Sequence, residues 1–207
     1  MDIDLAGLAA SRSLVLVEGD SDKAALETLA MRRGRNLTGE GVAVVAMGGA
    51  TNIGRFLALA GPRGLGLSLA GLCDAGEEDH VRRALARAGA GRGDCRAALE
   101  ELGFWVCSAD LEDELIRAAG VPAVERVIRS QGELKAFRTF QRQPAQQDVS
   151  VVAQLHRFMG TRSGRKRRYA TLLALAIDPT AVPRPLAGVL ASCGERQPGR
   201  ARHEPRG

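Results

Sequence analysis

The sequence is poor in the residues that several common kinds of site require. Its four cysteines include no Cys-x-x-Cys pair and it has only three histidines, so neither a zinc site nor a disulfide framework is indicated. Aromatic residues make up 3% of the chain, too few to predict a stacking surface for single-stranded nucleic acid. A Walker A motif is also missing. A metal bound here would have to rely on oxygen ligands, which favours hard divalent ions.

Long hydrophobic runs are missing as well. No segment approaches the roughly 20 apolar residues that cross a bilayer, and the first residues lack the basic start and apolar core of a secretory signal. We therefore expect a cytoplasmic protein without membrane contact. Its 207 residues, 45% of them hydrophobic, suit one globular domain with appendages.

The most informative stretch combines a strand pattern with two carboxylates. Four apolar residues at 14–17 predict a buried strand, Gly19 predicts a turn, and the Ala/Leu-rich residues 23–31 predict a helix. Glu18 directly follows the strand and Asp22 comes four residues later. Ligands of open α/β sheets collect beyond the carboxyl ends of the strands, so these acids predict half of a metal site. Alternatively they are surface acids, Asp22 favouring the positive end of the helix.

Acids also follow two later strand patterns. An apolar strand within residues 66–74 ends on Asp74, and a strand at 104–107 precedes an acidic helix start at 110–114. The strand at 42–46 ends instead in a glycine-rich turn. With helical patterns between them, these segments predict an α/β fold of about four mainly parallel strands flanked by helices, with a C-terminal helical extension. Parallel strands would bring the acids to one edge of the sheet.

Helix capping is the alternative reading of several of these acids. Asp110 can cap the helix that follows it, with Asp113 as the partner three residues on. Glu112 and Glu77 can likewise be acids that complement the positive end of a helix. The sequence leaves both readings open.

The motifs resemble those of the Toprim domain, and among Toprim proteins those of the OLD (overcoming lysogenization defect) family nucleases. The residues that carry the resemblance are Glu18-Gly19 with Asp22, then Gly48-Gly49 with Asn52, then Asp74, and then Leu111-Glu112. The resemblance covers roughly residues 12–177 and implies a Toprim/Rossmann-like fold, Mg²⁺ or Mn²⁺ as cofactor, and metal-dependent endonuclease activity on DNA. Since no ATPase motif is present, we expect a domain without the ATPase part of such proteins.

One motif departs from the family pattern. Toprim domains are expected to have Asp-x-Asp, and this chain has Asp74-Ala75-Gly76. Glu77 is a candidate to supply the missing oxygen. The alternative is a catalytically degenerate Toprim-like module that binds nucleic acid or a protein partner. A third reading makes Asp74 the phosphate acceptor of a receiver-like domain.

The predicted helical extension is strongly basic. The segment from Arg117 to Arg168 contains twelve Lys and Arg residues and only three acids. This excess of positive charge is typical of a surface that contacts a polyanion. Lys166 is one of only three lysines, and the resemblance implies a functional lysine late in the domain, which would neutralise charge developing on a phosphate. The alternative is a solvated basic turn.

These inferences give the following assignments. The domains are a leader (1–11), a Toprim-like core (12–118), a basic helical extension (119–178), and a closing segment with a disordered tail (179–207). Catalysis is assigned to Glu18, Asp74 and Lys166. Metal binding is assigned to Glu18, Asp22, Asp74, Glu77, Asp110 and Glu112. Nucleic-acid binding is assigned to Arg165, Lys166, Arg167 and Arg168. The expected partners are DNA, with RNA as the alternative, and a separate or upstream ATPase.

Overall fold

The computed structural model describes residue 8, residues 10–161 and residues 164–193. Most of the predicted leader lies outside these residues, as does the last part of the segment 179–207, where we expect a disordered tail. Within the described part of the chain, no helix has both the length and the apolar character needed to cross a membrane.

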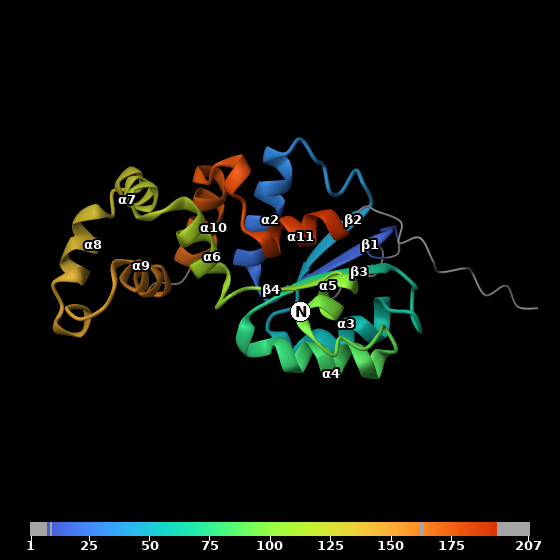
Figure 1. The fold of residues 1–207 in the computed structure, drawn as a ribbon. Coiled ribbons are helices and arrows are strands. Elements are labelled where there is room, and N and C mark those ends of the chain that lie inside the picture. Colours follow the sequence, from blue (N-terminus) through green and yellow to red (C-terminus); the bar gives the residue numbers. More distant parts are fainter. Residues whose placement is uncertain (1–7, 9, 162–163, 194–207) are drawn as a thin grey trace, which may run out of the picture.

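Four parallel strands form the centre of the molecule (Figure 1). They are β1 (Ser13–Val17), β2 (Val42–Ala46), β3 (Ser68–Cys73) and β4 (Phe104–Val106), arranged in the order β2-β1-β3-β4. All five residues of β1 are buried, as expected for an apolar run that is covered on both faces. The predicted α/β fold with about four parallel strands is confirmed.

Side chains of β1 point alternately to the two faces of the sheet and define two hydrophobic clusters. Leu14 and Leu16 join one cluster with α3 (Ile53–Ala60), α4 (Glu78–Ala88) and α5 (Arg96–Glu101). Val15 and Val17 join the other. The second cluster includes α2 (Asp20–Arg32), α6 (Leu111–Ala119), α7 (Val121–Ser130), α8 (Leu134–Gln141), α9 (Val151–Gly160), α10 (Arg165–Ala176) and α11 (Arg184–Ser192).

The helical extension is continuous with the core. Phe137 of α8 and Phe158 of α9 meet edge to face, with ring centroids 5.1 Å apart, and both belong to the cluster that covers the sheet. Short 3₁₀ turns, η1 (Ala50–Asn52), η2 (Ala75–Glu77), η3 (Pro144–Gln146) and η4 (Pro179–Ala181), connect the longer elements. In Figure 1, α7, α8 and α9 project beyond the sheet on the side of its carboxyl edge.

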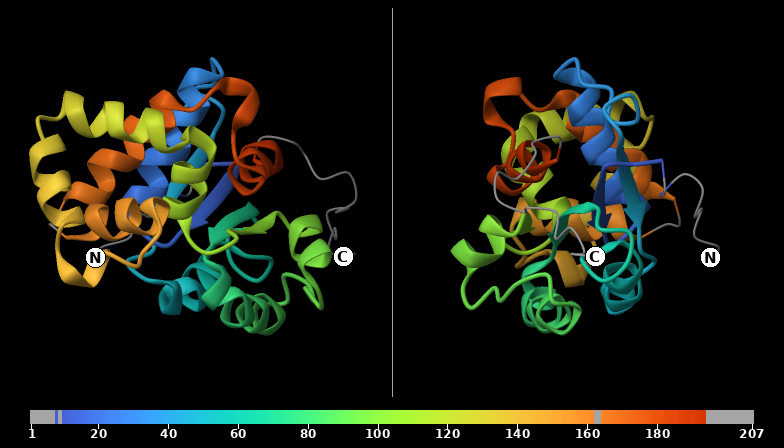
Figure 2. Two further views of the ribbon diagram at one scale, coloured as in Figure 1. Left: turned by 60° about the vertical axis from the view of Figure 1, so that its left-hand side comes forward. Right: turned by 90° about the vertical axis from the view of Figure 1, so that its right-hand side faces the viewer.

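Helices α2 and α10 lie side by side, as Figure 2 shows. At their carboxyl ends, Nη1 of Arg32 donates to the carbonyl oxygens of Ala174 and Ile177 at 2.8 and 2.6 Å. These carbonyls end α10, so the arginine satisfies groups that a helix leaves unpaired. The two helices therefore run parallel, with their amino ends at the same side of the sheet.

Helix α11 closes the sheet over β4 and β3. Its Leu186, Val189 and Leu190 are buried, and the backbone of Gly188 lies directly against the ring of Trp105. Trp105 Nε1 also donates to Ser192 Oγ at 3.1 Å. The closing segment that we expected after residue 179 therefore contains a helix that completes the core.

We expect Gly188→Ala to destabilise the protein, because the added Cβ would lie 2.3 Å from two ring atoms of Trp105. Overpacking of this kind costs about 1–3 kcal/mol of unfolding free energy, measurable by urea denaturation. Gly54→Ala is the matched control, since Gly54 is also helical and a Cβ there meets open space. Equal stability of the two variants would contradict the packing described here.

Candidate metal centre

The sheet brings acids from distant parts of the chain to one edge. Glu18 follows β1, Asp74 follows β3, and Asp110 lies at the start of α6 after β4. The register pairs Leu16 with Gly71, and Cys73 with Val106, so these three strands end beside one another. Because the strands are parallel, the acids that follow them share the carboxyl edge, where α/β proteins bind ligands.

Asp22 lies in the first turn of α2 and is only 8% exposed. Its Oδ2 accepts a hydrogen bond from the backbone N–H of Gly19 at 2.9 Å, so the carboxylate also caps the turn between β1 and α2. Its pKa is raised to about 6, chiefly by burial and also by the charges of Glu112 and Glu18, while the Gly19 hydrogen bond acts to lower it. The capping role and the position at the sheet edge therefore coexist.

Asp74 lies at the centre of the acidic group. Burial, the largest cause, and the charges of four nearby carboxylates together raise the pKa of this carboxyl to about 7. The four carboxylates are Asp22, Glu18, Asp110 and Glu112. The mutual repulsion of these groups shows that the strand-end acids converge.

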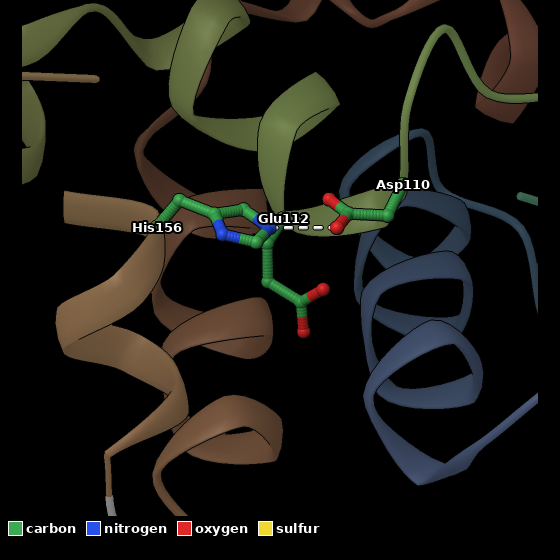
Figure 3. A group of neighbouring side chains, drawn as sticks. All are labelled: Asp110, Glu112 and His156. Atoms are coloured by element: carbon green, nitrogen blue, oxygen red, sulfur yellow. Dashed lines mark hydrogen bonds and ion pairs between the residues drawn. The ribbon is translucent and has the colours of Figure 1, made fainter. Parts of the chain in front are cut away.

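A second group of ligands combines two acids with a histidine (Figure 3). Asp110, Glu112 and His156 each offer a ligand atom, and these atoms lie within 4.8 Å of one another. Oδ2 of Asp110 lies 2.6 Å from Nε2 of His156, while Oδ1 accepts the backbone N–H of Asp113. The predicted cap of α6 by Asp110 is thus confirmed, and its other oxygen is directed to the histidine.

Glu112 is the most buried acid of this group, with 5% of its surface exposed. Among the described residues, its Oε1 has no hydrogen-bond partner. Its Oε2 lies 3.4 Å from Nζ of Lys166, which stands in the first turn of α10. A buried carboxylate oxygen without a donor is costly, and a bound cation would satisfy it.

The basic start of α10 divides into a buried and an exposed part. Arg165 is 4% exposed, and its guanidinium donates to the carbonyl of Phe158 and lies over the Phe158 ring. Lys166, Arg167 and Arg168 are exposed. The sequence assigned all four residues to nucleic-acid binding, but the structure gives Arg165 a packing role, because its side chain faces inward.

Glu133 holds this end of α10 in place. It accepts hydrogen bonds from Tyr169 Oη at 2.7 Å and from Arg168 Nη2 at 2.9 Å, and it lies 3.3 Å from Arg165 Nε. Burial acts to raise the pKa of Glu133, but the hydroxyl and the two guanidinium groups lower it below its ordinary value. The charged network fixes the helix that carries Lys166.

The glycine-rich turn after β2 supports Glu18. The backbone N–H groups of Gly48 and Gly49 both donate to the Glu18 carbonyl, at 3.0 and 3.1 Å, and Gly49 has φ of 122°, which favours glycine. Asn52 Nδ2 donates to the carbonyl of Met47 at 3.0 Å. These hydrogen bonds fix the backbone beside Glu18, so we interpret Gly48, Gly49 and Asn52 as residues that shape the site.

The departure from Asp-x-Asp is visible at the turn after Asp74. Gly76 is exposed in η2, and a Cβ there would meet no atom within 4 Å. Glu77 follows it, but in the described ranges it is not among the acids whose ligand atoms meet around His156. Its predicted role as a replacement ligand stays a prediction.

His156 is the site residue that sequence reasoning missed. It lies on α9, 46 positions from Asp110, and no spacing motif connects it to the acids. Only the packing of α9 against α6 places it there. A lone histidine in a helix of the extension gave no signal of this contact.

Comparison with known proteins supports the same class of fold. Residues 11–75 match the family model for the overcoming lysogenization defect protein-like TOPRIM domain. No curated protein matches the sequence. The chain therefore contains a Toprim domain, which also argues against the receiver-like reading of Asp74.

Solved structures extend the match beyond residue 75. The C-terminal region of the Xanthomonas campestris pv. campestris OLD protein is 27% identical, with a TM-score of 0.65, covering 89% of this chain and 95% of that one. The C-terminal region of the Burkholderia pseudomallei OLD protein, at 22% identity and a TM-score of 0.67, shares the fold over 89% of this chain and 97% of that one. The Toprim domain is thus of the OLD-like kind.

The raised pKa of Asp74 leads to a pH-dependent prediction. With metal removed by a chelator, a protonated Asp74 favours the folded state, and this contribution is lost as pH rises from the ordinary value of 3.8 through about 7. We expect Asp74→Asn to raise the Tm at pH 8 and to change it little at pH 4. Glu101→Gln, at an exposed acid on α5, is the control. A lower Tm of Asp74→Asn at pH 8 would contradict the crowding of these acids.

Proposed function

We propose that this chain is a divalent-metal-dependent nuclease that hydrolyses phosphodiester bonds of DNA, with Mg²⁺ or Mn²⁺ as cofactor. One observation carries the proposal: carboxylates that follow three parallel strands converge beside a lysine whose amine lies 3.4 Å from a buried glutamate. Acids so close together are unfavourable unless cations neutralise them. The OLD-like Toprim match supports the same chemistry.

The available donors fit hard divalent ions. Glu18, Asp22 and Asp74 would hold one ion, and Asp110 and Glu112, with Glu77 as the candidate additional ligand, would hold a second. The unpartnered Oε1 of Glu112 supports this assignment. Bound divalent ions supply Lewis-acid stabilisation of the phosphate and lower the pKa of water.

The protein side chains have separate tasks in this scheme. Glu18 and Asp74 orient the reacting groups at the ends of β1 and β3. Lys166 is half exposed, so its amine can turn from Glu112 toward a phosphate and stabilise the charge that develops on the leaving oxygen. The amino end of α10 adds a favourable field for the same anion.

The surface beside the site suits a polyanion. Arg167 and Arg168 follow Lys166 in α10 and are exposed, within a segment rich in arginine. Phosphate contacts of this kind supply affinity without reading sequence. We propose DNA as the substrate, with RNA as the alternative, in the cytoplasm, and an ATPase in a separate or upstream segment as a functional partner.

Gly76 favours a second candidate function. Without the second acid of Asp-x-Asp, the first ion position has fewer ligands, and the domain could bind DNA or a protein without turnover. The two functions differ in whether phosphodiester bonds are broken.

We expect cleavage of supercoiled plasmid with Mg²⁺ or Mn²⁺, and about a 100-fold or larger loss of rate in Glu18→Gln and in Lys166→Met, because each removes charge from the reacting centre. Gel electrophoresis of nicked and linear products measures the rate. Glu101→Gln should retain wild-type activity. Unchanged cleavage by Glu18→Gln would show that the activity does not come from this site.

We expect Gly76→Asp to bind Mg²⁺ about tenfold more tightly than the wild type, because it adds a charged ligand where the structure leaves open space. Calorimetry measures the affinity, and Gly76→Asn controls for side-chain size without charge. If Gly76→Asp cleaves plasmid and the wild type does not, the binding-module function is correct for the natural chain.

A further inference from the structure

The Asp110, Glu112 and His156 group contains a nitrogen donor among oxygen donors. The imidazole comes from α9 in the helical extension, whereas both acids belong to the start of α6. Leu155, Phe158 and Met159 of α9 are buried on either side of His156 in sequence, so the helix is firmly packed. The fold therefore delivers this ring to the acids from a separate element.

The distances in this group suit ligands of one ion. Nε2 of His156 and Oδ2 of Asp110 lie 2.6 Å apart, and the third ligand atom, from Glu112, is within 4.8 Å of both. Neighbouring ligands at metal distances of about 2.0–2.2 Å lie roughly 3 Å apart, so small movements would place a cation among all three. Figure 3 shows the Asp110 carboxylate facing the His156 ring, with the Glu112 side chain extending to one side of this pair.

A simple hydrogen bond between His156 and Asp110 explains only part of this arrangement. It does not explain Oε1 of Glu112, which is buried and has no hydrogen-bond partner in the described part of the chain. Lys166 approaches the other oxygen of the same carboxylate. A cation bound by all three residues would satisfy Oε1 of Glu112 as well as Asp110 and His156.

We propose that His156 Nε2 is a metal ligand, and that it makes this position select Mn²⁺ over Mg²⁺. Imidazole is a softer donor than carboxylate, and it raises affinity for first-row transition ions while adding little for Mg²⁺, which prefers oxygen. This inference rests on the proposed function in one respect, namely that it concerns the same metal site. Metal binding alone can test it, without a measurement of cleavage.

Pulsed electron paramagnetic resonance of bound Mn²⁺ tests the ligand directly, since a coordinated imidazole gives a nitrogen hyperfine coupling. The full chain is compared with His156→Ala, with His156→Gln, which keeps a hydrogen-bond donor for Asp110 but removes the imidazole, and with His80→Ala. His80, on α4, is the matched histidine control. Calorimetric titrations with Mn²⁺ and with Mg²⁺ accompany the spectra, and circular dichroism checks that each variant is folded.

We expect the nitrogen coupling in the wild type and in His80→Ala, and its loss in both His156 variants. We expect His156→Ala to weaken Mn²⁺ binding by about tenfold or more and Mg²⁺ binding by less than about threefold. Mn²⁺ bound to the wild type without nitrogen coupling would overturn the inference whatever the variants do. If such a protein still cleaves plasmid, the proposed function stands, whereas failure to bind either ion would overturn both.

Discussion

Repulsion among carboxylates is the constraint on which this structure depends. A parallel sheet directs the ends of its strands to one edge, and here three of those ends carry acids. Burial and the charges of its neighbours together raise the pKa of Asp74 to about 7. A cluster of carboxylates is stable only where positive charge lies close to it. The fold supplies part of this positive charge.

The helical extension supplies partners for two of these acids. Lys166 and His156 both come from it, and each contacts an acid at the start of α6. Helices α2, α6 and α10 also begin near these acids, and the amino end of a helix favours negative charge. The network around Glu133 keeps α10 in position, so residues without a direct role in the site still determine its geometry.

Much of the fold could be predicted from the sequence because its signals are local. A continuous apolar run such as 14–17 indicates a strand buried on both faces, and Asp110 before Leu111 indicates a helix cap. The convergence of Glu18 and Asp74 follows from parallel strands alone. These inferences need no knowledge of how distant segments pack.

The remaining features depend on tertiary packing. Arg165 and Tyr169 lie one turn apart on the same face of α10, and this face is turned toward Glu133. Arg165 is buried for this reason. His156 meets Asp110 only because α9 packs on α6. Helix α11 was not anticipated as a helix, since Pro183, Pro185 and Gly188 interrupt the helical pattern in its sequence. Residue types alone do not carry this information.

The parallel pairing of α2 and α10 has a mechanical consequence. Asp22 lies in the first turn of α2 and Lys166 in the first turn of α10. At the carboxyl ends of the two helices, Arg32 of α2 donates hydrogen bonds to the carbonyl oxygens of Ala174 and Ile177. The axial offset between the Asp22 carboxylate and the Lys166 amine is thus set about three turns away, at the carboxyl ends of the two helices. A slip of a single turn would displace the amine by about 5.4 Å. The hydrogen bonds of Arg32 therefore fix the relative axial position of the amino ends of α2 and α10.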